Sequence, residues 1–301
     1  MRLPAIDASE LSRLLPGLQN VHLVSSQGQK RVFSGDFQGQ KIAIKAILTG
    51  LTSAAPDEEE DQEKNDDLEV ANARLKREIE ILSKSQCPNL VRLGPISPHQ
   101  ATLNDEQITV YTEEWLPGVD LASRIRKGPL AREDVKRLGL ALSSAVGELD
   151  QLGYLHRDIK PANILSREDD EFVLVDPGLA FDRNGTSLTA PGRVPGTVAY
   201  LAPERVSGTA KRQIDVRSDF FPIGVVLYEA LTGKHPFNRK GMTEYDILTA
   251  IQARPHQRLT RADDPEQEGT IEGVIDRLLA KRAHLRFRDV SDLTTALRDA
   301  Q

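Results

Sequence analysis

One ten-residue stretch, residues 156–165, constrains this chain more than any other. Its sequence is HRDIKPANIL, so Asp158 is followed two residues later by Lys160 and five residues later by Asn163. Pro161 restricts the backbone between these side chains. A carboxylate can orient a hydroxyl group and accept its proton, an ammonium can neutralise a moving phosphoryl group, and a carboxamide oxygen can bind Mg²⁺. The alternative is a polar turn before a strand, because short motifs also match by chance.

The composition is that of an ordinary globular protein. The chain has 301 residues, of which 39% are hydrophobic and 28% charged, enough for one two-lobed fold or two domains. It has no apolar run of about 18 residues and no signal-peptide pattern at its start, so we expect a cytoplasmic protein without a membrane partner. The single cysteine, Cys87, allows no internal disulfide and suits a reducing compartment.

Acidic residues are concentrated in one segment. The formal net charge is -6, but residues 57–67 hold eight acidic residues and one lysine, a local balance of -7. The remainder is near +1, which gives no support for nucleic-acid binding. We expect an acidic insertion at 53–67, with 57–67 solvated and disordered; docking of a basic partner is the alternative.

The first half of the chain shows the alternation of strands, interrupted by one helical pattern. β-branched residues and turn-forming glycines predict an antiparallel sheet, and apolar residues at helical spacing predict a helix over 68–83. A short leading helix is expected over 8–15. The predicted strands are 21–24, 30–33, 41–47, 90–93 and 107–112.

The second half is predicted to be mostly helical, with a buried strand at 172–175. An apolar helix follows Asp219 and ends at Gly233. Pro222 is compatible with that helix if it falls in the first turn, where backbone N–H groups have no partner within the helix. The other predicted helices are 132–152, 243–252, 271–281 and 290–298.

The motifs, taken together, resemble those of eukaryotic-like (Hanks-type) serine/threonine protein kinases. Residues 156–165 are similar to the catalytic loop HRDxKPxN of that family, and 42–45 (IAIK) to its VAIK strand. Residues 176–178 (DPG) are similar to the DFG metal motif, and 196–204 (GTVAYLAPE) to the segment GTxxYxAPE. The resemblance covers residues 21–297.

The family fold would be α+β and bilobal, with a small antiparallel-sheet lobe carrying one main helix and a larger, mostly helical lobe. The resemblance implies these boundaries: an N-terminal extension at 1–20, and a kinase domain at 21–301 composed of a small lobe at 21–113 with the insertion 53–67, a hinge at 114–119 and a large lobe at 120–301.

The resemblance implies transfer of the γ-phosphoryl group of ATP to a serine or threonine hydroxyl of a protein. Asp158 would be the base, Lys160 would stabilise charge, and Thr197 would bond to both. Mg²⁺, with Mn²⁺ as the alternative ion, would be held by Asn163 and Asp176.

Nucleotide binding is also implied by the resemblance. Lys45 would grip the phosphates, and the register of the predicted helix selects Glu78 rather than Glu80 as its partner. The implied nucleotide-binding residues are Val32, Ala43, Lys45, Glu114, Leu116, Asp120, Leu165 and Asp176.

Three features depart from the family pattern. Ser25, Gln27 and Lys30 stand where the phosphate-covering loop has glycines, so close backbone approach to the phosphates is less assured. Pro177 replaces the phenylalanine of DFG, and Glu113 places a carboxylate just before the hinge, where it needs a counter-charge. These departures keep open an alternative, a pseudokinase that acts as a binding scaffold.

Two further expectations concern the segment after the metal motif. Thr186, Ser187 and Thr189 are candidate phosphosites, which implies autophosphorylation by a second copy in addition to protein substrates. The family register also implies that Glu204 pairs with Arg286 and that Asp219 braces the catalytic loop.

Overall fold

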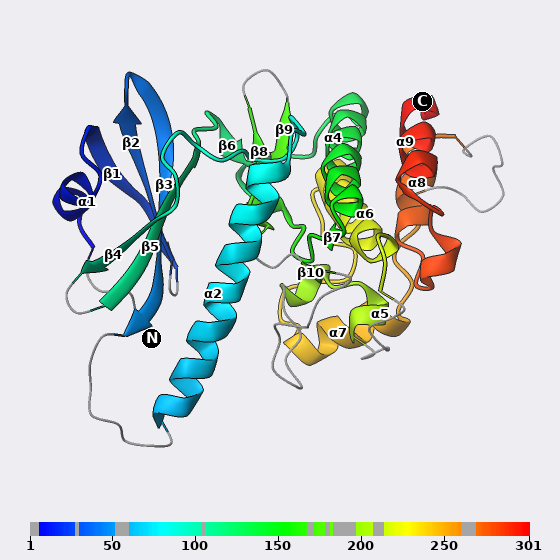
Figure 1. Cartoon of the computed structure of the whole chain (residues 1–301). Helices are drawn as coiled ribbons and strands as arrows, with labels where there is room; N and C mark the ends of the chain where they lie inside the picture. Colours follow the sequence, from blue (N-terminus) through cyan, green and yellow to red (C-terminus); the bar gives the residue numbers. More distant parts are fainter. Residues whose placement is uncertain are drawn as a thin grey trace. The chain divides into compact units, whose positions relative to one another are not determined.

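The structure, a computed structural model, describes residues 6–27, 30–51, 60–103, 106–167, 171–177, 181–182, 197–206, 214–259 and 269–301. The chain divides into two compact units, the first formed by Met1–Lys84 and Val91–Leu116, the second by Ser85–Leu90 and Pro117–Gln301. Figure 1 shows the strands and helices of both, coloured along the sequence. Among the described residues, no helix combines the length and apolar composition needed to cross a bilayer.

The first unit is built on a five-stranded antiparallel sheet in the order β1-β2-β3-β5-β4 (Figure 1). Val32 and Tyr111 both lie opposite Lys45, on the strands to either side of it. Opposite residues share a face, as do residues two apart, so Ala43 and Glu113 lie on the same face as these three. The strands are β1 (Leu18–Gln27), β2 (Lys30–Phe37), β3 (Gln40–Leu51), β4 (His99–Leu103) and β5 (Glu106–Glu114).

The leading helix belongs to the core of this unit. Helix α1 (Ala8–Leu14) begins with a capping box, in which the side chain of Asp7 accepts from the backbone N–H of Glu10 and the Glu10 side chain accepts from that of Asp7. Leu11 is fully buried in the hydrophobic cluster that also contains Phe33 and Ile44 of the sheet. The segment predicted to be an extension therefore contributes to the packing of the first unit.

The long helix of the first unit corrects one prediction. Helix α2 spans Glu60–Lys84, so it starts eight residues before the predicted helix and includes residues 60–67 of the acidic segment. The expectation of disorder was wrong for these eight residues; residues 53–59 lie outside the described ones. Glutamate and lysine are good helix formers, and acidic residues near a helix N-terminus interact favourably with its dipole.

A second correction concerns the strands before the predicted hinge. Residues 90–93 form only two isolated bridges, at Leu90 and at Leu93, rather than a strand. The edge strand next to β5 is instead β4, whose residues 99–103 are half-buried or exposed. An edge strand with a polar sequence and one solvent-exposed face shows little hydrophobic alternation, so the sequence did not predict β4.

The second unit is mostly helical, and its helix α4 packs against both α6 and α9 (Figure 1). Helices predicted from apolar spacing are all present. Its elements are β6 (Val119–Asp120), α3 (Leu121–Ile125), α4 (Arg132–Gln151), β7 (Tyr154–Leu155), η1 (Pro161–Asn163), β8 (Ile164–Ser166), β9 (Phe172–Leu174), β10 (Phe181–Asp182), η3 (Val198–Tyr200), α5 (Pro203–Val206), α6 (Arg217–Thr232), α7 (Glu244–Ala253), α8 (Ile271–Leu278), η6 (Ala283–Leu285) and α9 (Val290–Asp299).

Helix α6 is buried over nearly all of its length. It ends at Gly233, whose φ of 70° is left-handed and whose N–H donates to the carbonyl of Glu229, as predicted. Pro222 is the sixth residue of the helix, beyond the first turn, so the condition under which it would lose no helical hydrogen bond is not met. It removes the N–H that would bond to the Ser218 carbonyl, and close packing on all sides offsets this loss.

Candidate active site

Asp158 lies in the loop between β7 and η1, where donors surround its carboxylate. Lys160 Nζ is 2.7 Å and Asn163 Nδ2 is 3.0 Å from Oδ2, while the backbone N–H and the hydroxyl of Thr197 each lie 3.0 Å from Oδ1. Lys160 Nζ also donates to Thr197 Oγ1 at 2.8 Å. The structure therefore brings together four predicted site residues from two separate motifs, with both carboxylate oxygens fixed in direction.

The loop that carries Asp158 is held by the start of α6. Asp219, 1% exposed, accepts from the backbone N–H groups of His156 at 2.7 Å and of Arg157 at 3.1 Å. Arg205 Nη1 donates to the carbonyl of Arg157 at 2.8 Å. Arg157 has a φ of 68°, a strained conformation for a non-glycine residue, which these contacts on both of its peptide groups hold in place. The predicted bracing by Asp219 is present.

His156 supports the same loop as a neutral imidazole. Its Nδ1 accepts from the N–H of Asp158 at 3.3 Å, so the ring proton belongs to Nε2, which lies 3.2 Å from the carbonyl oxygen of Val175. Burial lowers the pKa of His156 despite nearby carboxylates such as Asp219, in agreement with the neutral form. His156 thus joins the catalytic loop to the strand end that leads into Asp176.

Asn163 and Asp176 fit a magnesium ion by the chemistry of their oxygen atoms. The side-chain amide group of Asn163 donates from Nδ2 to Asp158, so its Oδ1 oxygen is the atom that could bind a cation. The N–H of Val175 donates to the Asn163 carbonyl at 2.9 Å, so the residue before Asp176 contacts Asn163 directly. An amide oxygen and a carboxylate are ligands that Mg²⁺ prefers, with water and phosphate oxygens completing its shell.

The backbone of Asp176 has an unusual conformation. Its φ is 61°, although a residue before proline normally takes an extended conformation. Aspartate is one of the few non-glycine residues that enters this left-handed region with some frequency. The Pro177 that replaces the aromatic residue of the family motif is buried in the structure. The third residue, Gly178, lies outside the described ones.

A second cluster of ionisable residues surrounds Lys45 in the first unit. Lys45 Nζ lies 3.1 Å from Glu78 Oε1 and forms a second, shorter ion pair with Glu113 Oε1. The hydroxyl of Tyr111 donates to Glu78 Oε1 at 2.7 Å. Glu80 instead pairs with Lys84 at the helix surface. The register that selected Glu78 is the one in the structure, and the counter-charge expected for Glu113 is Lys45.

These four side chains are enclosed by the first unit. Lys45, Glu78 and Glu113 are each 4% exposed, and Tyr111 is fully buried. Burial, followed by the charge of Glu78, raises the pKa of Tyr111 well above its usual range, so the phenol stays protonated and donates. Because water screens buried charges only weakly, the loss of one charged side chain would strongly affect the others in this cluster.

The remaining predicted nucleotide-binding residues lie on several elements. Val32 and Ala43 share the sheet face of Lys45, while Glu114 ends β5 and its N–H donates to the Arg92 carbonyl at 3.0 Å. In the second unit, the Asp120 carboxylate accepts from Ser123, at 2.8 Å from the N–H and 2.6 Å from the hydroxyl, and so caps α3. Leu116 is buried, and Leu165 is half-buried in β8.

The end of the segment 196–204 is held in place by a buried ion pair between Glu204 and Arg286. Both nitrogens Nη1 and Nη2 of Arg286 lie 2.8 Å from the two carboxylate oxygens of Glu204, and the Ser218 hydroxyl donates to Glu204 Oε1 at 2.8 Å. The predicted pairing is therefore present across 82 residues of sequence. Tyr200, in the same segment, donates to Glu229 Oε2 of α6 at 2.7 Å.

Comparison with known proteins agrees with this geometry. Residues 38–295 match the family of the protein kinase domain. The chain belongs to the protein kinase family. This kinase domain is 34% identical over 230 residues to the serine/threonine-protein kinase PknE of Mycobacterium tuberculosis, covering 75% of this chain and 38% of that protein.

Two further relatives show the same relation. The kinase domain is 28% identical over 275 residues to the probable serine/threonine-protein kinase PknB of Lactococcus lactis, covering 89% of the chain and 39% of the relative. It is 31% identical over 232 residues to the serine/threonine-protein kinase PknH of Mycobacterium bovis, covering 77% of the chain and 37% of the relative. The chain thus spans well under half the length of these relatives.

Three contacts of the kinase domain were missed by the reasoning from sequence. The ion pair of Glu113 with Lys45 follows from strand register, since Tyr111 lies opposite Lys45 and Glu113 is two residues further on. The bond from Tyr111 to Glu78 depends in addition on the place of α2, because Glu78 belongs to that helix. The contact of Arg205 with the catalytic loop has no local sequence signal.

Some predicted residues lie outside the described ranges. These are the candidate phosphosites Thr186, Ser187 and Thr189.

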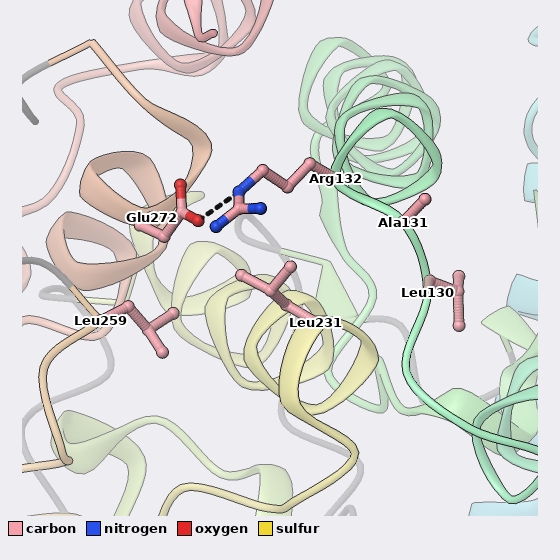
Figure 2. A pocket seen from close by; sticks show the side chains of 6 residues that line it. All are labelled: Leu130, Ala131, Arg132, Leu231, Leu259 and Glu272. Carbon is pink, nitrogen blue, oxygen red and sulfur yellow. Dashed lines mark hydrogen bonds and ion pairs between the residues drawn. The ribbon is translucent and has the colours of Figure 1, made fainter.

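Figure 2 shows a cavity of the second unit, about 360 Å³ in volume, that none of the predicted site residues lines. Arg132 at the start of α4 donates from Nε to Glu272 Oε1 of α8 at 2.6 Å, so the two charged residues of its wall neutralise each other. The other lining residues are Leu130, Ala131, Leu231 and Leu259. An apolar wall with a closed ion pair offers no group for phosphate or metal chemistry.

Proposed function

We propose that this kinase domain transfers the γ-phosphoryl group of ATP to a serine or threonine hydroxyl of a protein. The observation that carries the proposal is the cluster at Asp158, in which Lys160, Asn163 and Thr197 all donate to one carboxylate. The names of the relatives, serine/threonine-protein kinases, support the hydroxyl as acceptor.

The cluster divides the chemical work among its members. Asp158 would orient the attacking hydroxyl and accept its proton, because its oxygens are fixed in direction by donors on both sides. Lys160, 2.7 Å from Asp158, would neutralise charge on the transferred group, and Thr197 would hold both side chains at that separation. Mg²⁺ or Mn²⁺ bound by Asn163 and Asp176 would polarise the phosphate oxygens.

Positioning of the phosphates would depend on Lys45. Glu78 holds the ammonium at 3.1 Å and is itself held by the Tyr111 hydroxyl, so the lysine is oriented by a residue that is fixed in turn. Val32 and Ala43, on the same sheet face, would contact the base.

The experiment that tests this function is incubation of the purified protein with labelled ATP, Mg²⁺ and a set of peptides containing serine or threonine. We expect label on the peptides, loss of transfer to background when EDTA removes the metal, and recovery when Mg²⁺ or Mn²⁺ is returned. ATP binding without phosphate transfer would contradict the proposal and favour the alternative function, a pseudokinase that acts as a binding scaffold. The observation that favours this alternative is the ion pair of Glu113 with Lys45.

A substitution pair tests the role of the helix partner. Glu78→Gln should lower turnover by about ten- to a hundredfold, because the buried hydrogen bond from Lys45 loses the negative charge of its acceptor and the neutral amide orients the ammonium less firmly. The matched control is Glu80→Gln, two residues away on the same helix, whose Lys84 partner is exposed. Steady-state rates of both variants should differ by that factor; equal rates would contradict the assignment.

Autophosphorylation is the finer part of the proposal. We propose that one copy phosphorylates another at Thr186, Ser187 or Thr189, which lie in the segment between the two motifs. Mass spectrometry of the active protein, compared with a triple alanine variant, tests this. Full activity of that variant would leave these phosphates without a role.

A further inference from the structure

Glu113 makes a contact that the proposed reaction does not use. It lies two residues beyond Tyr111 on β5, and Tyr111 is directly opposite Lys45 on β3. Diagonal neighbours on adjacent strands lie within reach of long side chains, and both Lys45 and Glu113 are long. The strand register therefore places the carboxylate of Glu113 against the ammonium that would grip the phosphates.

The two carboxylates at Lys45 come from different elements of the first unit. Glu78 accepts from the Tyr111 hydroxyl at 2.7 Å as well as from Lys45 at 3.1 Å, and it belongs to α2. Glu113 belongs to the sheet and makes the shorter contact with Lys45. A nucleotide phosphate that approaches Lys45 must therefore share the ammonium with Glu113, and it carries the same sign of charge as this carboxylate.

Burial makes this competition strong. The side chains of Lys45, Glu78 and Glu113 are 5%, 6% and 5% exposed, so solvent screens their charges poorly. Charge-assisted hydrogen bonds of this kind are about twice as strong as neutral ones. Exchange of the Glu113 contact for a phosphate contact therefore gains little for the nucleotide.

We propose that Glu113 sets the affinity for the nucleotide phosphates by competing with them for Lys45. It is thus a specificity-determining residue for the phosphate part of the ligand, and its removal tightens binding. The inference rests on the proposed function, since it takes Lys45 as the residue that contacts the phosphates.

The test is calorimetric titration of ATP, in the presence of Mg²⁺, and of adenosine into the wild-type protein and Glu113→Gln. Glutamine keeps the length and shape of the side chain but removes its charge. We expect the Kd for ATP to fall about tenfold, the effect of freeing one charge-assisted hydrogen bond. The Kd for adenosine should stay unchanged, because adenosine has no phosphate to bring to Lys45.

Controls separate this effect from changes in folding. Glu80→Gln, a carboxylate removed from the surface of the same unit, should leave the Kd for ATP unchanged. In a Lys45→Met background, Glu113→Gln should give a much smaller gain, since the shared partner is missing and only the direct repulsion between Glu113 and the phosphates is relieved. A second variant, Glu113→Met, should shift the Kd for ATP in the same direction, and thermal melting confirms that each variant is folded.

The outcomes distinguish this inference from the proposed function. Tighter ATP binding in the Glu113 variants of a protein that transfers no phosphate would support the inference and overturn the function. Phosphate transfer by the wild type, together with unchanged ATP affinity in both folded Glu113 variants, would support the proposed function and overturn the inference about Glu113. Equal tightening for adenosine and ATP would also overturn the inference, because Glu113 would then act on the base rather than on the phosphates.

Discussion

Asp158→Asn is expected to lower the rate of phosphoryl transfer by about two to four orders of magnitude, the usual contribution of a positioned general base. Asparagine cannot accept the hydroxyl proton. In addition, Thr197 donates twice to Oδ1, and Lys160 and Asn163 donate to Oδ2, so either orientation of the new amide turns its NH₂ group toward donors. The substitution therefore removes the base and two of its hydrogen bonds together.

The measurement is the turnover number with labelled ATP, alongside the Kd for ATP from calorimetry. The turnover number should fall while the Kd stays within a factor of about two, because the proposed function has Asp158 act on the acceptor hydroxyl rather than on the nucleotide. The matched control is Asp292→Asn, a carboxylate in the same unit with a side chain 38% exposed, which should leave both values unchanged. Wild-type turnover in Asp158→Asn would remove the catalytic assignment.

The catalytic loop was predictable because its chemistry is local. Asp158, Lys160 and Asn163 lie within six residues, and the backbone between them brings the side chains together whatever the rest of the chain does. Glu78 was implied by the register of the family resemblance, and helical spacing added only that Glu80, two residues further on, faces elsewhere. In both cases, the distance between the residues along the sequence also determines how their side chains lie in space.

Contacts set by distant pairing were not predictable in the same way. Glu113 was expected to need a counter-charge, but its partner lies 68 residues earlier and is selected by the register of β3 against β5. The start of α2 was placed too late because charge was taken to indicate disorder, whereas glutamate and lysine also favour helices. The spacing of apolar residues indicates which side chains are buried, but it does not indicate how distant strands pair or where a charged helix begins.

The second large effect is on stability. Arg286→Ala should lower the free energy of unfolding by about 3–5 kcal/mol, the usual result of breaking a buried ion pair from one side. The Arg286 side chain is 0% exposed and binds both oxygens of Glu204. It also donates to three backbone carbonyls, those of Ala280 at 2.9 Å, Arg217 at 2.6 Å and Lys281 at 3.4 Å. Alanine leaves a carboxylate and three carbonyls without this donor.

The pH dependence of that loss identifies its cause. Burial tends to raise the pKa of Glu204, but the hydrogen bonds and charge of Arg286 outweigh it, so the pKa lies below its ordinary value of 4.5. In the wild type, the pair therefore contributes stability above about pH 4.5 and loses it as the pH falls through the folded-state pKa. Without Arg286 the largest opposing contributions to burial are lost and only the weaker hydrogen bonds from Ser218 and the backbone remain, so the pKa of Glu204 rises and protonation in acid relieves the buried charge. The deficit of the variant should therefore shrink as the pH falls from 7 to 4.

Urea unfolding followed by far-UV circular dichroism measures this loss, because the helices of the second unit dominate that signal; the single tryptophan, Trp115, belongs to the first unit. The matched control is Arg288→Ala, two residues away, whose side chain is 78% exposed and pairs with Asp289 at the surface. That variant should stay within about 0.5 kcal/mol of the wild type at every pH. Two results would contradict this prediction: a loss of stability below about 1 kcal/mol for Arg286→Ala, or a loss that does not change with pH. Either result would mean that Glu204 becomes solvated and stays charged without Arg286. The position of α5 beside α6 would then not depend on this ion pair.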